Sequence, residues 1–402
     1  MISDTAVIRL VFFTDILIED FDGASRTMFQ LIRRIPSTKF KVLFICGTGP
    51  EQLFGFEVIR LPAMRLPVNR DYKIALPWLS KEKIRRKMDA FRPQVIHIAT
   101  PSLLGQFALQ YAQKHKVPVV TMYHTHFISY IDYYLRYAPF LIQLVRARAS
   151  RAHRTFYNGC NKVYIPSETI AAELINMGVE AEKCSIWKRG IDTTQFTPAK
   201  RDIAYIRSLT GNWKPNILFV SRLVWEKNLQ TLIHIYKIAE RQGSPYNFII
   251  AGDGIAAKAC KEEMKNAFFM GKLSHDALSR LYASSDIFLF PSVSETFGNV
   301  VAEAMASGLP CVIANGGGSR DFIQDGINGF VSQPFHTLEY IQKIEIILSN
   351  HSLRSAMSQA AVHATRLLNW NQLVQRYLTD LTSLVAQYQQ PMHQEPLLPA
   401  RS

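Results

Sequence analysis

The sequence predicts an α/β protein built from two doubly wound units, each a parallel sheet covered by helices on both faces. Short apolar runs rich in β-branched residues recur along the chain, separated by stretches with helical periodicity. These runs do not alternate with polar residues, as expected for strands that are buried on both faces. With 402 residues, 48% of them hydrophobic, the chain is long enough for two such units.

The first unit is expected to span residues 1–197. Its apolar runs are bounded by Gly, Pro, Asp or Ser, and the alternation of strand and helix indicates parallel pairing. The expected strands are Val7–Phe13, Lys41–Cys46, Val95–Ala99, Pro118–Met122 and Val163–Pro166. Helices such as Ser25–Ile35, Lys81–Phe91 and Gly105–His115 are expected between them.

A looser stretch, Lys188–Pro215, separates the units, and the second is expected to span residues 198–370. Its expected strands are Asn216–Val220, Asn247–Ala251, Ala267–Met270, Ile287–Phe290 and Cys311–Ala314. Residues 371–388 hold an amphipathic helix, Leu373–Gln387. The last residues, 389–402, are rich in Pro and Gln, which is typical of a disordered tail.

Charge is the unusual feature of the composition: the net charge is +14 and the isoelectric point is about 9.5. Residues 60–92 hold ten Lys or Arg interleaved with aromatic residues and leucine, and residues 133–162 contain no acid. Such segments favour an anionic membrane surface. The alternative is that the apolar side chains of these segments pack into the protein core while the cations face solvent. Nucleic acid is not expected, because no recognition motif accompanies the charge.

The five cysteines include no Cys-x-x-Cys pair, which argues against a zinc site or a disulfide framework and fits a reducing cytosol. The N-terminal stretch lacks the basic region and cleavage site of a signal peptide. No apolar run reaches the roughly 18 residues that a membrane span needs. We therefore expect a cytoplasmic protein that meets a membrane only from its surface.

Ligands of open parallel sheets bind beyond the carboxyl ends of the strands. After the first strand, Gly23 would let the backbone at a helix start approach a phosphate, or would simply be a helix-entry glycine. Asp20 and Asp22 in the same loop look like a metal-binding pair. Acids that open a helix are more typically N-caps, so no metal site is assigned. After the fourth strand, YHTHF offers His124 and His126, which point the same way.

Three loops of the second unit also follow strands and are candidates for binding a ligand. Arg222 and Lys227 in SRLVWEKN suit a diphosphate, although a solvated basic loop is the alternative. Gly252 and Gly254 in GDGI would admit a phosphate or sugar beside the backbone, or would form an ordinary turn. Residues 315–321, NGGGSRD, supply a further permissive loop.

The segment PSVSETFGNVVAEAMASGLPCV is the most specific. It puts Glu295 at the mouth of the crevice and Glu303 in the following helix. Because a carboxylate repels a diphosphate, we expect Glu295 to contact sugar hydroxyls and Glu303 those of a ribose. The backbone N–H groups of Phe297, Gly298 and Asn299, at the helix N-terminus, can bind the remaining oxygens.

In their order and spacing, these segments resemble the retaining glycosyltransferases of family four, which have the GT-B fold. SRLVWEKN, GDGI, FFMGKL, the ETFGNVVAEAMASG segment and the NGGG loop carry the match, and YHTHF and IWKRGIDTTQF extend it to the first half. The branches that look most similar are sulfoquinovosyldiacylglycerol synthases and bacterial GDP-mannose-dependent lipid α-mannosyltransferases. Ile255, where Pro is more usual, and a single Gly23 in place of a double glycine depart from the family pattern.

The resemblance implies roles for the cations and acids of the second unit. Arg222 and Lys227 would hold the donor diphosphate and stabilise its charge as the glycosidic bond breaks. Glu295 would contact the donor sugar, and Glu303 would contact the ribose.

For the remaining positions, the resemblance implies contacts with other parts of the donor. The Gly23 loop would close over the phosphates, and His124 would lie near the primary hydroxyl of the sugar and the reacting centre. The backbone around Met270 and Gly271 would read the base. The C-terminal helix would cross back onto the first unit.

The resemblance implies a retaining, metal-independent hexosyltransferase without a cofactor. A nucleotide diphosphate sugar, with GDP-mannose favoured over a UDP-sugar, would be the donor, and a lipid hydroxyl at the inner face of the cell membrane would be the acceptor. The alternatives are the same chemistry on a soluble glycan or small molecule, and a non-catalytic protein that binds nucleotide or an anionic surface.

Overall fold

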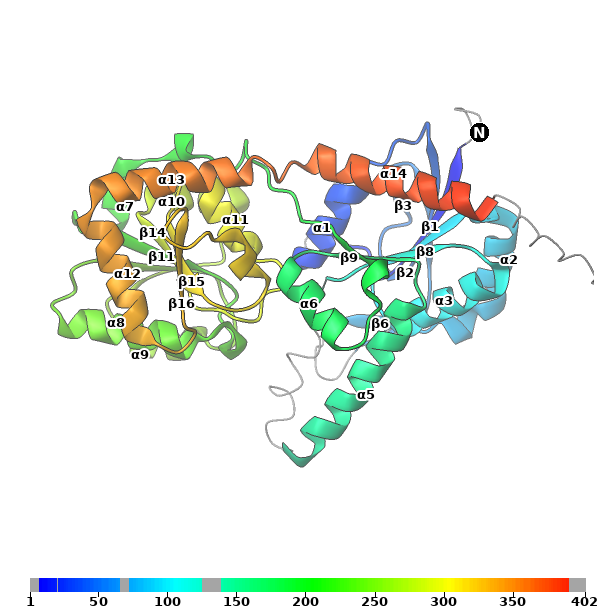
Figure 1. Cartoon of the computed structure of the whole chain (residues 1–402), viewed down its shortest axis with the longest axis horizontal. Coiled ribbons are helices and arrows are strands. Elements are labelled where there is room, and N and C mark those ends of the chain that lie inside the picture. Colours follow the sequence, from blue (N-terminus) through cyan, green and yellow to red (C-terminus); the bar gives the residue numbers. More distant parts are fainter. Residues whose placement is uncertain (1–6, 20, 66–71, 125–138, 390–402) are drawn as a thin grey trace, which may run out of the picture.

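In a computed structural model, the chain forms two α/β units that lie side by side (Figure 1). Residues 7–19, 21–65, 72–124 and 139–389 are described. The expected tail lies outside the described residues apart from Gln389, which ends the last helix.

The first unit is built on an eight-stranded sheet with the order β10-β9-β8-β7-β1-β2-β4-β3. All five predicted strands are present, with ends shifted by at most three residues. The strands are β1 Ile8–Ile16, β2 Phe40–Thr48, β3 Gln52–Leu53, β4 Phe56–Arg60, β7 Val95–Ile98, β8 Val119–Met122, β9 Lys162–Ile165 and β10 Cys184–Ile186.

The five predicted strands pair in parallel, as expected, and the antiparallel pairs of the described residues involve strands that were not predicted. The pair β3–β4 is antiparallel, and a separate antiparallel pair joins β5 Ala63–Arg65 to β6 Lys73–Ala75. A short connection allows only antiparallel pairing for β3 and β4, and strands of two or three residues are too short to show a hydrophobic period.

Helices cover both faces of this sheet, and a hydrophobic core fills each side. Among the described residues these helices are α1 Gly23–Ile32, η1 Pro77–Ser80, α2 Lys81–Phe91, α3 Leu103–His115, α5 Pro139–Asn158, α6 Glu168–Asn176 and η3 Ala181–Lys183. Helix α5 extends away from the body of the unit (Figure 1). Within the described ranges, no helix is both long and apolar enough to cross a membrane.

The second unit is an all-parallel six-stranded sheet with the order β13-β12-β11-β14-β15-β16 around one core. Its strands are β11 Asn216–Val220, β12 Asn247–Ala251, β13 Phe268–Gly271, β14 Ile287–Phe290, β15 Cys311–Ala314 and β16 Gly329–Ser332. Its helices are η4 Pro198–Lys200, α7 Ile203–Thr210, η5 Trp225–Lys227, α8 Leu229–Arg241, α9 Ala257–Glu263, α10 His275–Ser284, α11 Asn299–Ala306, η6 Gly318–Phe322, α12 Thr337–Ser349 and α13 His351–Thr365.

The last helix, α14 Trp370–Gln389, returns to the first unit and packs on its sheet (Figure 1). The hydroxyl of Tyr377 lies 2.8 Å from Nδ1 of the buried His97 on β7, and Tyr164 on β9 donates to Asp380 at 3.0 Å. The chain therefore crosses between the units twice. The two crossings are joined where the Ile191 N–H donates to the carbonyl of Leu368 at 2.9 Å.

Candidate functional site

Two helix N-termini, one from each unit, face each other at the junction. A Cβ built on Gly23, the first residue of α1, would lie 3.5 Å from the Nδ2 atom of Asn299, the first residue of α11. Helix N-termini carry partial positive charge and unpaired N–H groups, so this junction favours an anion. Asp22 caps α1, because its side chain accepts from the Ser25 N–H at 2.7 Å. Asp20 and His126 lie outside the described residues.

The buried Lys227 forms an ion pair with the partly exposed Glu295 beside this junction. The Lys227 ammonium lies 2.5 Å from Oε1 of Glu295 and donates to the Ser294 hydroxyl at 3.2 Å. Only 6% of the lysine side chain is exposed, against 20% for the glutamate. The structure thus brings together two of the predicted residues, with the carboxylate holding the ammonium in place.

Arg222 stands apart from this pair. Its side chain is 67% exposed, and its guanidinium lies 3.6 Å from Glu226. The two cations expected to act together are therefore held differently: Lys227 is fixed, whereas Arg222 extends from the same loop into solvent.

The loop that carries Arg222 is held by Gly252 and Gly254, which follow β12. Both have positive φ, +131° and +157°. A Cβ on Gly252 would lie 1.8 Å from the Ser221 carbonyl oxygen, and one on Gly254 would lie 2.4 Å from that of Leu223. The space that these glycines were expected to offer a ligand is thus filled by protein backbone. Glycine is therefore needed at both positions for close packing against the cation loop, and their contact with a phosphate or sugar stays a prediction.

The expected base-reading stretch lies at the end of the edge strand β13. Gly271 is exposed with φ +64°, and its carbonyl accepts from the Gly252 N–H at 2.7 Å. Met270 is half-buried. This stretch is therefore next to the glycine loop rather than isolated at the sheet edge.

The loop of Glu295 is held by the glycine-rich segment after β15. The Gly318 N–H donates to the Glu295 carbonyl at 2.6 Å, and a Cβ on Gly318 would lie 2.0 Å from the Thr296 carbonyl oxygen. At the start of α11, Gly298 has φ +88° and faces Ser319. Glycine at these positions allows two loops to lie against each other and fixes the Glu295 backbone.

Glu303 and Phe297 are the remaining predicted residues of this segment. Glu303 accepts from the Tyr282 hydroxyl at 3.2 Å, and burial raises its pKa to about 7, against the opposing charge of Arg26 on α1. Arg26 itself lies 2.5 Å from Nε2 of His275, across the junction. The Phe297 side chain is buried against Phe322.

His124 lies in the first unit, two residues after the end of strand β8. Burial lowers its pKa well below 6.5, and the charge of Arg189 lowers it further, so the ring is neutral at pH 7. Its Nε2 atom is buried and has no hydrogen-bond partner among the described residues.

Arg189 is a central residue that the sequence analysis did not assign. It is 7% exposed and lies on the first crossing between the units. Its guanidinium donates to the His124 carbonyl at 3.2 Å and to the Thr296 hydroxyl at 3.5 Å, so it contacts both units. Burial lowers its pKa to about 10, while Asp22 and Glu295 oppose that shift. Its position within IWKRGIDTTQF, a segment that carried the family resemblance, was the available signal.

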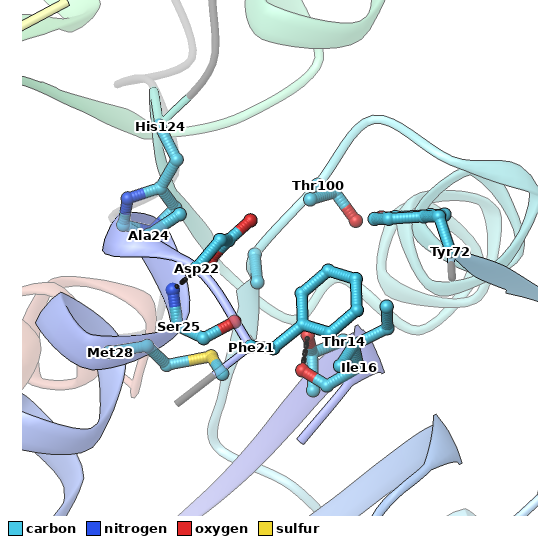
Figure 2. A pocket seen from close by; sticks show the side chains of 11 residues that line it. Thr14, Ile16, Phe21, Asp22, Ala24, Ser25, Met28, Tyr72, Thr100 and His124 are labelled. Atoms are coloured by element: carbon cyan, nitrogen blue, oxygen red, sulfur yellow. Dashed lines mark hydrogen bonds between the residues drawn. The ribbon is translucent and has the colours of Figure 1, made fainter. Parts of the chain in front are cut away.

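A pocket of about 50 Å³ opens on the first unit beside His124 (Figure 2). Its walls come from β1, the start of α1, the residue before β6 and the loops after β7 and β8. The residues that matter for its chemistry are Thr14, Phe21, Asp22, Tyr72, Thr100 and His124.

Two family models match the chain, one on each unit. The first, "Glycosyltransferase Family 4", matches residues 21–195. The second, "Glycosyl transferases group 1", matches residues 207–363. Together they cover both sides of the junction.

Relatives match along most of the chain. A GDP-mannose-dependent alpha-mannosyltransferase of Corynebacterium glutamicum is 27% identical over 390 residues, 94% of this chain and 89% of the relative. The sulfoquinovosyl transferase SQD2 of Arabidopsis thaliana is 32% identical over 334 residues, 80% of this chain and 62% of the relative. An alpha-monoglucosyldiacylglycerol synthase of Streptococcus pneumoniae is 26% identical over 322 residues, 77% of this chain and 71% of the relative.

The fold is likewise shared with solved structures. Anabaena Alr3699/HepE, determined in complex with UDP, superposes with a TM-score of 0.74 at 18% identity over 94% of this chain and 100% of that chain. The two Rossmann-like sheets and the returning helix form the GT-B fold. The chain belongs to the group 1, family 4 glycosyltransferases.

Proposed function

We propose that this enzyme transfers a hexose from a nucleotide diphosphate sugar to a lipid hydroxyl, with retention of the α configuration and without a metal ion. GDP-mannose is the donor we put first, because the mannosyltransferase of C. glutamicum matches nearly the whole chain. The enzyme would act at the inner face of the cell membrane.

The observation that carries the donor assignment is the meeting of two helix N-termini beside a buried ammonium. A diphosphate has the charge and the oxygens that the N–H groups at Gly23 and Asn299 and the Lys227 ammonium require. Arg222, exposed on the same loop as Lys227, can turn onto the diphosphate when the donor arrives.

The chemistry follows from these charges. The bond between the anomeric carbon and the diphosphate oxygen breaks, the acceptor oxygen bonds to that carbon from the same face, and the hydroxyl proton passes to the departing diphosphate. Lys227 and Arg222 stabilise the charge that develops on the leaving group. Glu295 stabilises the oxocarbenium-like sugar rather than attacking it.

A lipid acceptor is supported by one relative and one surface. The relative from S. pneumoniae is named for a diacylglycerol product. Helix α5 extends from the first unit with exposed Leu144 and Val145 beside exposed arginines, a combination suited to an anionic bilayer. A soluble glycan acceptor is the second candidate, favoured if α5 serves only to solubilise the chain.

The donor proposal is tested with the purified chain in EDTA. GDP and UDP are titrated by calorimetry, and release of nucleotide from GDP-mannose and UDP-glucose is followed with and without lipid vesicles. We expect binding of one nucleotide in the micromolar range and turnover that EDTA does not reduce. Absence of binding to both nucleotides, or turnover restored only by a divalent cation, would contradict the proposal.

A further inference from the structure

The residue after Glu295 is held by the first unit at both its backbone and its side chain. The Ser167 hydroxyl, at the start of α6, donates to the Thr296 carbonyl at 3.3 Å. The Thr296 hydroxyl donates to the His124 carbonyl at 3.1 Å. Thr296 is only 9% exposed, although it lies in a loop. The position of the loop that carries Glu295 therefore depends on the first unit as well as on the second.

Arg189 joins the same two groups from the first crossing between the units. One nitrogen of its guanidinium, Nη2, donates to the His124 carbonyl at 3.2 Å and to the Thr296 hydroxyl at 3.5 Å. The Arg189 guanidinium, the His124 carbonyl and the Thr296 hydroxyl thus contact one another, and we call these three groups the clasp. The clasp contains one group from the first unit, one from the second and one from the chain that connects them.

The backbone beside Arg189 is fixed where the two crossings meet. A Cβ built on Gly190 would lie 2.5 Å from the Cγ atom of Trp370, the first residue of α14, so only glycine allows this approach. The next residue, Ile191, donates its N–H to the Leu368 carbonyl at 2.9 Å. We therefore expect a movement of the units to break the contacts of the guanidinium rather than to bend the backbone of Arg189.

The charge of Arg189 is compensated by acids of both units. The residue is 7% exposed, and burial lowers the pKa of its guanidinium to about 10, so the group stays charged at pH 7. The charges of Asp22, at the start of α1, and of Glu295 oppose this lowering. A buried cation is costly unless charges of opposite sign compensate for it. Glu295 compensates for this cation only while the units are together, which favours a clasp that forms on closure.

The clasp connects the two side chains that are expected to face the donor sugar, one from each unit. His124 belongs to the first unit, and Glu295, next to Thr296, belongs to the second. We propose that Arg189 and Thr296 are positioning residues, which bring Glu295 and His124 together on the donor sugar when the units close. The inference rests on the proposed glycosyltransferase function and deepens it.

Cleavage of the glycosidic bond then waits for closure, whereas binding of the nucleotide does not use the clasp. The diphosphate contacts proposed above come from Lys227 and the two helix N-termini. Loss of the clasp should therefore slow the chemical step more than it weakens nucleotide binding, because small misplacements of reacting groups are costly.

Thr296→Val tests the clasp without a change of charge and with little change of volume. The variant is made in the full chain. Nucleotide release from the nucleotide sugar that turns over is measured in single turnovers, with enzyme in excess, so that product release does not limit the rate. We expect the rate constant to fall at least about tenfold. The Kd for the free nucleotide diphosphate, measured by calorimetry, should stay within about threefold of the parent value.

Two threonine variants serve as controls. Thr210→Val removes a similarly buried hydroxyl, 8% exposed, that donates to the Ile206 carbonyl within α7. Thr169→Val removes a hydroxyl that joins the units at Asp321 but does not belong to the clasp. Both variants should keep the single-turnover rate within about threefold of the parent rate.

Arg189 is tested by substitution alone and in combination with Thr296→Val. Arg189→Gln removes the charge and should lower the single-turnover rate at least about tenfold. Arg189→Lys keeps a charged nitrogen that ends one bond earlier, so its rate should lie between those of Arg189→Gln and the parent chain. Because both side chains act through one clasp, the double variant should be no more than about threefold slower than Arg189→Gln.

Four results would overturn the inference: an unchanged single-turnover rate in Thr296→Val, a loss of nucleotide affinity in proportion to the loss of rate, an equal loss of rate in Thr169→Val, or losses that multiply in the double variant. A parent chain that turns over no nucleotide sugar would overturn the proposed function, and the inference with it. The two failures are distinguishable, because the parent chain is active in the first case and inactive in the second.

Discussion

Lys227 is the residue on which the donor side depends most, because its buried ammonium is fixed by Glu295 at 2.5 Å. We predict that Lys227→Met lowers kcat/KM for the nucleotide sugar by at least 100-fold. The variant removes the ammonium that stabilises the negative charge of the leaving group. It also leaves the largely buried Glu295 carboxylate without its partner. Steady-state release of nucleotide measures the effect.

Lys343→Met is the matched control for that variant. Lys343 is also a largely buried lysine paired with a glutamate, Glu339 at 2.5 Å, but it lies on α12 away from the junction. It should lose some stability and keep kcat/KM within about twofold. If Lys227→Met and Lys343→Met lower kcat/KM equally, the role of Lys227 is structural only.

Glu303 links stability to pH. Burial raises its pKa to about 7 from an ordinary value of 4.5, so the folded chain holds a proton that the unfolded chain releases. The free energy of unfolding must then fall as pH rises from about 4.5 to 7 and level off above that range. We predict that Glu303→Gln removes this fall. The variant should therefore gain roughly 2–3 kcal/mol relative to the parent chain between pH 5 and pH 8.

Urea unfolding at pH 5 and pH 8, without nucleotide, checks the prediction. Glu339→Gln provides a control of opposite sign, because Lys343 lowers the pKa of that carboxyl. This control should be less stable than the parent chain by a constant amount at pH 5 and pH 8, because the stabilisation by ionised Glu339 is complete above about 4.5 and is lost only at lower pH. A Glu303→Gln variant that is no more favoured at pH 8 than at pH 5 would show that the carboxyl ionises normally.

At the level of elements, the glycine turn after β12 positions the cation loop after β11. We predict that Gly252→Ala destabilises the chain by several kcal/mol and weakens nucleotide binding at least tenfold, because its Cβ would overlap the Ser221 carbonyl at 1.8 Å and displace the Arg222 loop. Thermal unfolding and calorimetric titration of the nucleotide measure the two effects.

Gly211→Ala separates this effect from backbone strain. Gly211 ends α7 with φ +68°, and a Cβ there would meet no atom within 4 Å. It should cost about 1 kcal/mol, the ordinary penalty of a left-handed residue, without changing nucleotide affinity. If both glycine variants bind nucleotide normally, the turn does not position the loop.

Many of the strands and loops could be predicted from the sequence. The long buried strands were identifiable because they are continuous apolar runs; Asn216–Val220 and Cys311–Ala314 agree to the residue. The strand pair β5–β6 was missed because three-residue strands carry no period. The donor loops could be located because they follow strands. The pairing of Lys227 with Glu295, and the burial of Arg189 between both units, depend on packing between distant segments that no local pattern contains.

On the scale of the whole molecule, the candidate site lies between two units that the chain joins by two crossings. Arg189 contacts His124 in one unit and Thr296 in the other, and the Thr169 N–H and hydroxyl both donate to Asp321 across the same junction. These contacts hold the arrangement described here. We expect these contacts to separate when substrates enter, as is common for enzymes whose site closes over its substrates.

The proposed association with a bilayer depends on α5. Its exposed Arg146, Arg148 and Arg151 accompany the exposed apolar side chains Leu144 and Val145 on a helix that extends from the body (Figure 1). An arginine near an anionic leaflet contributes about 1 kcal/mol, and the apolar side chains add burial in the interface.

We predict that the triple change of Arg146, Arg148 and Arg151 to Gln weakens binding to phosphatidylserine vesicles at least tenfold in flotation at low salt. The matched control changes the exposed Lys258, Lys261 and Lys265 of the second unit to Gln. Both variants lose three charges, so net charge alone would weaken them equally. Loss in the α5 variant only would orient the enzyme with α5 against the bilayer, and equal loss in both would leave the charge a property of the whole surface.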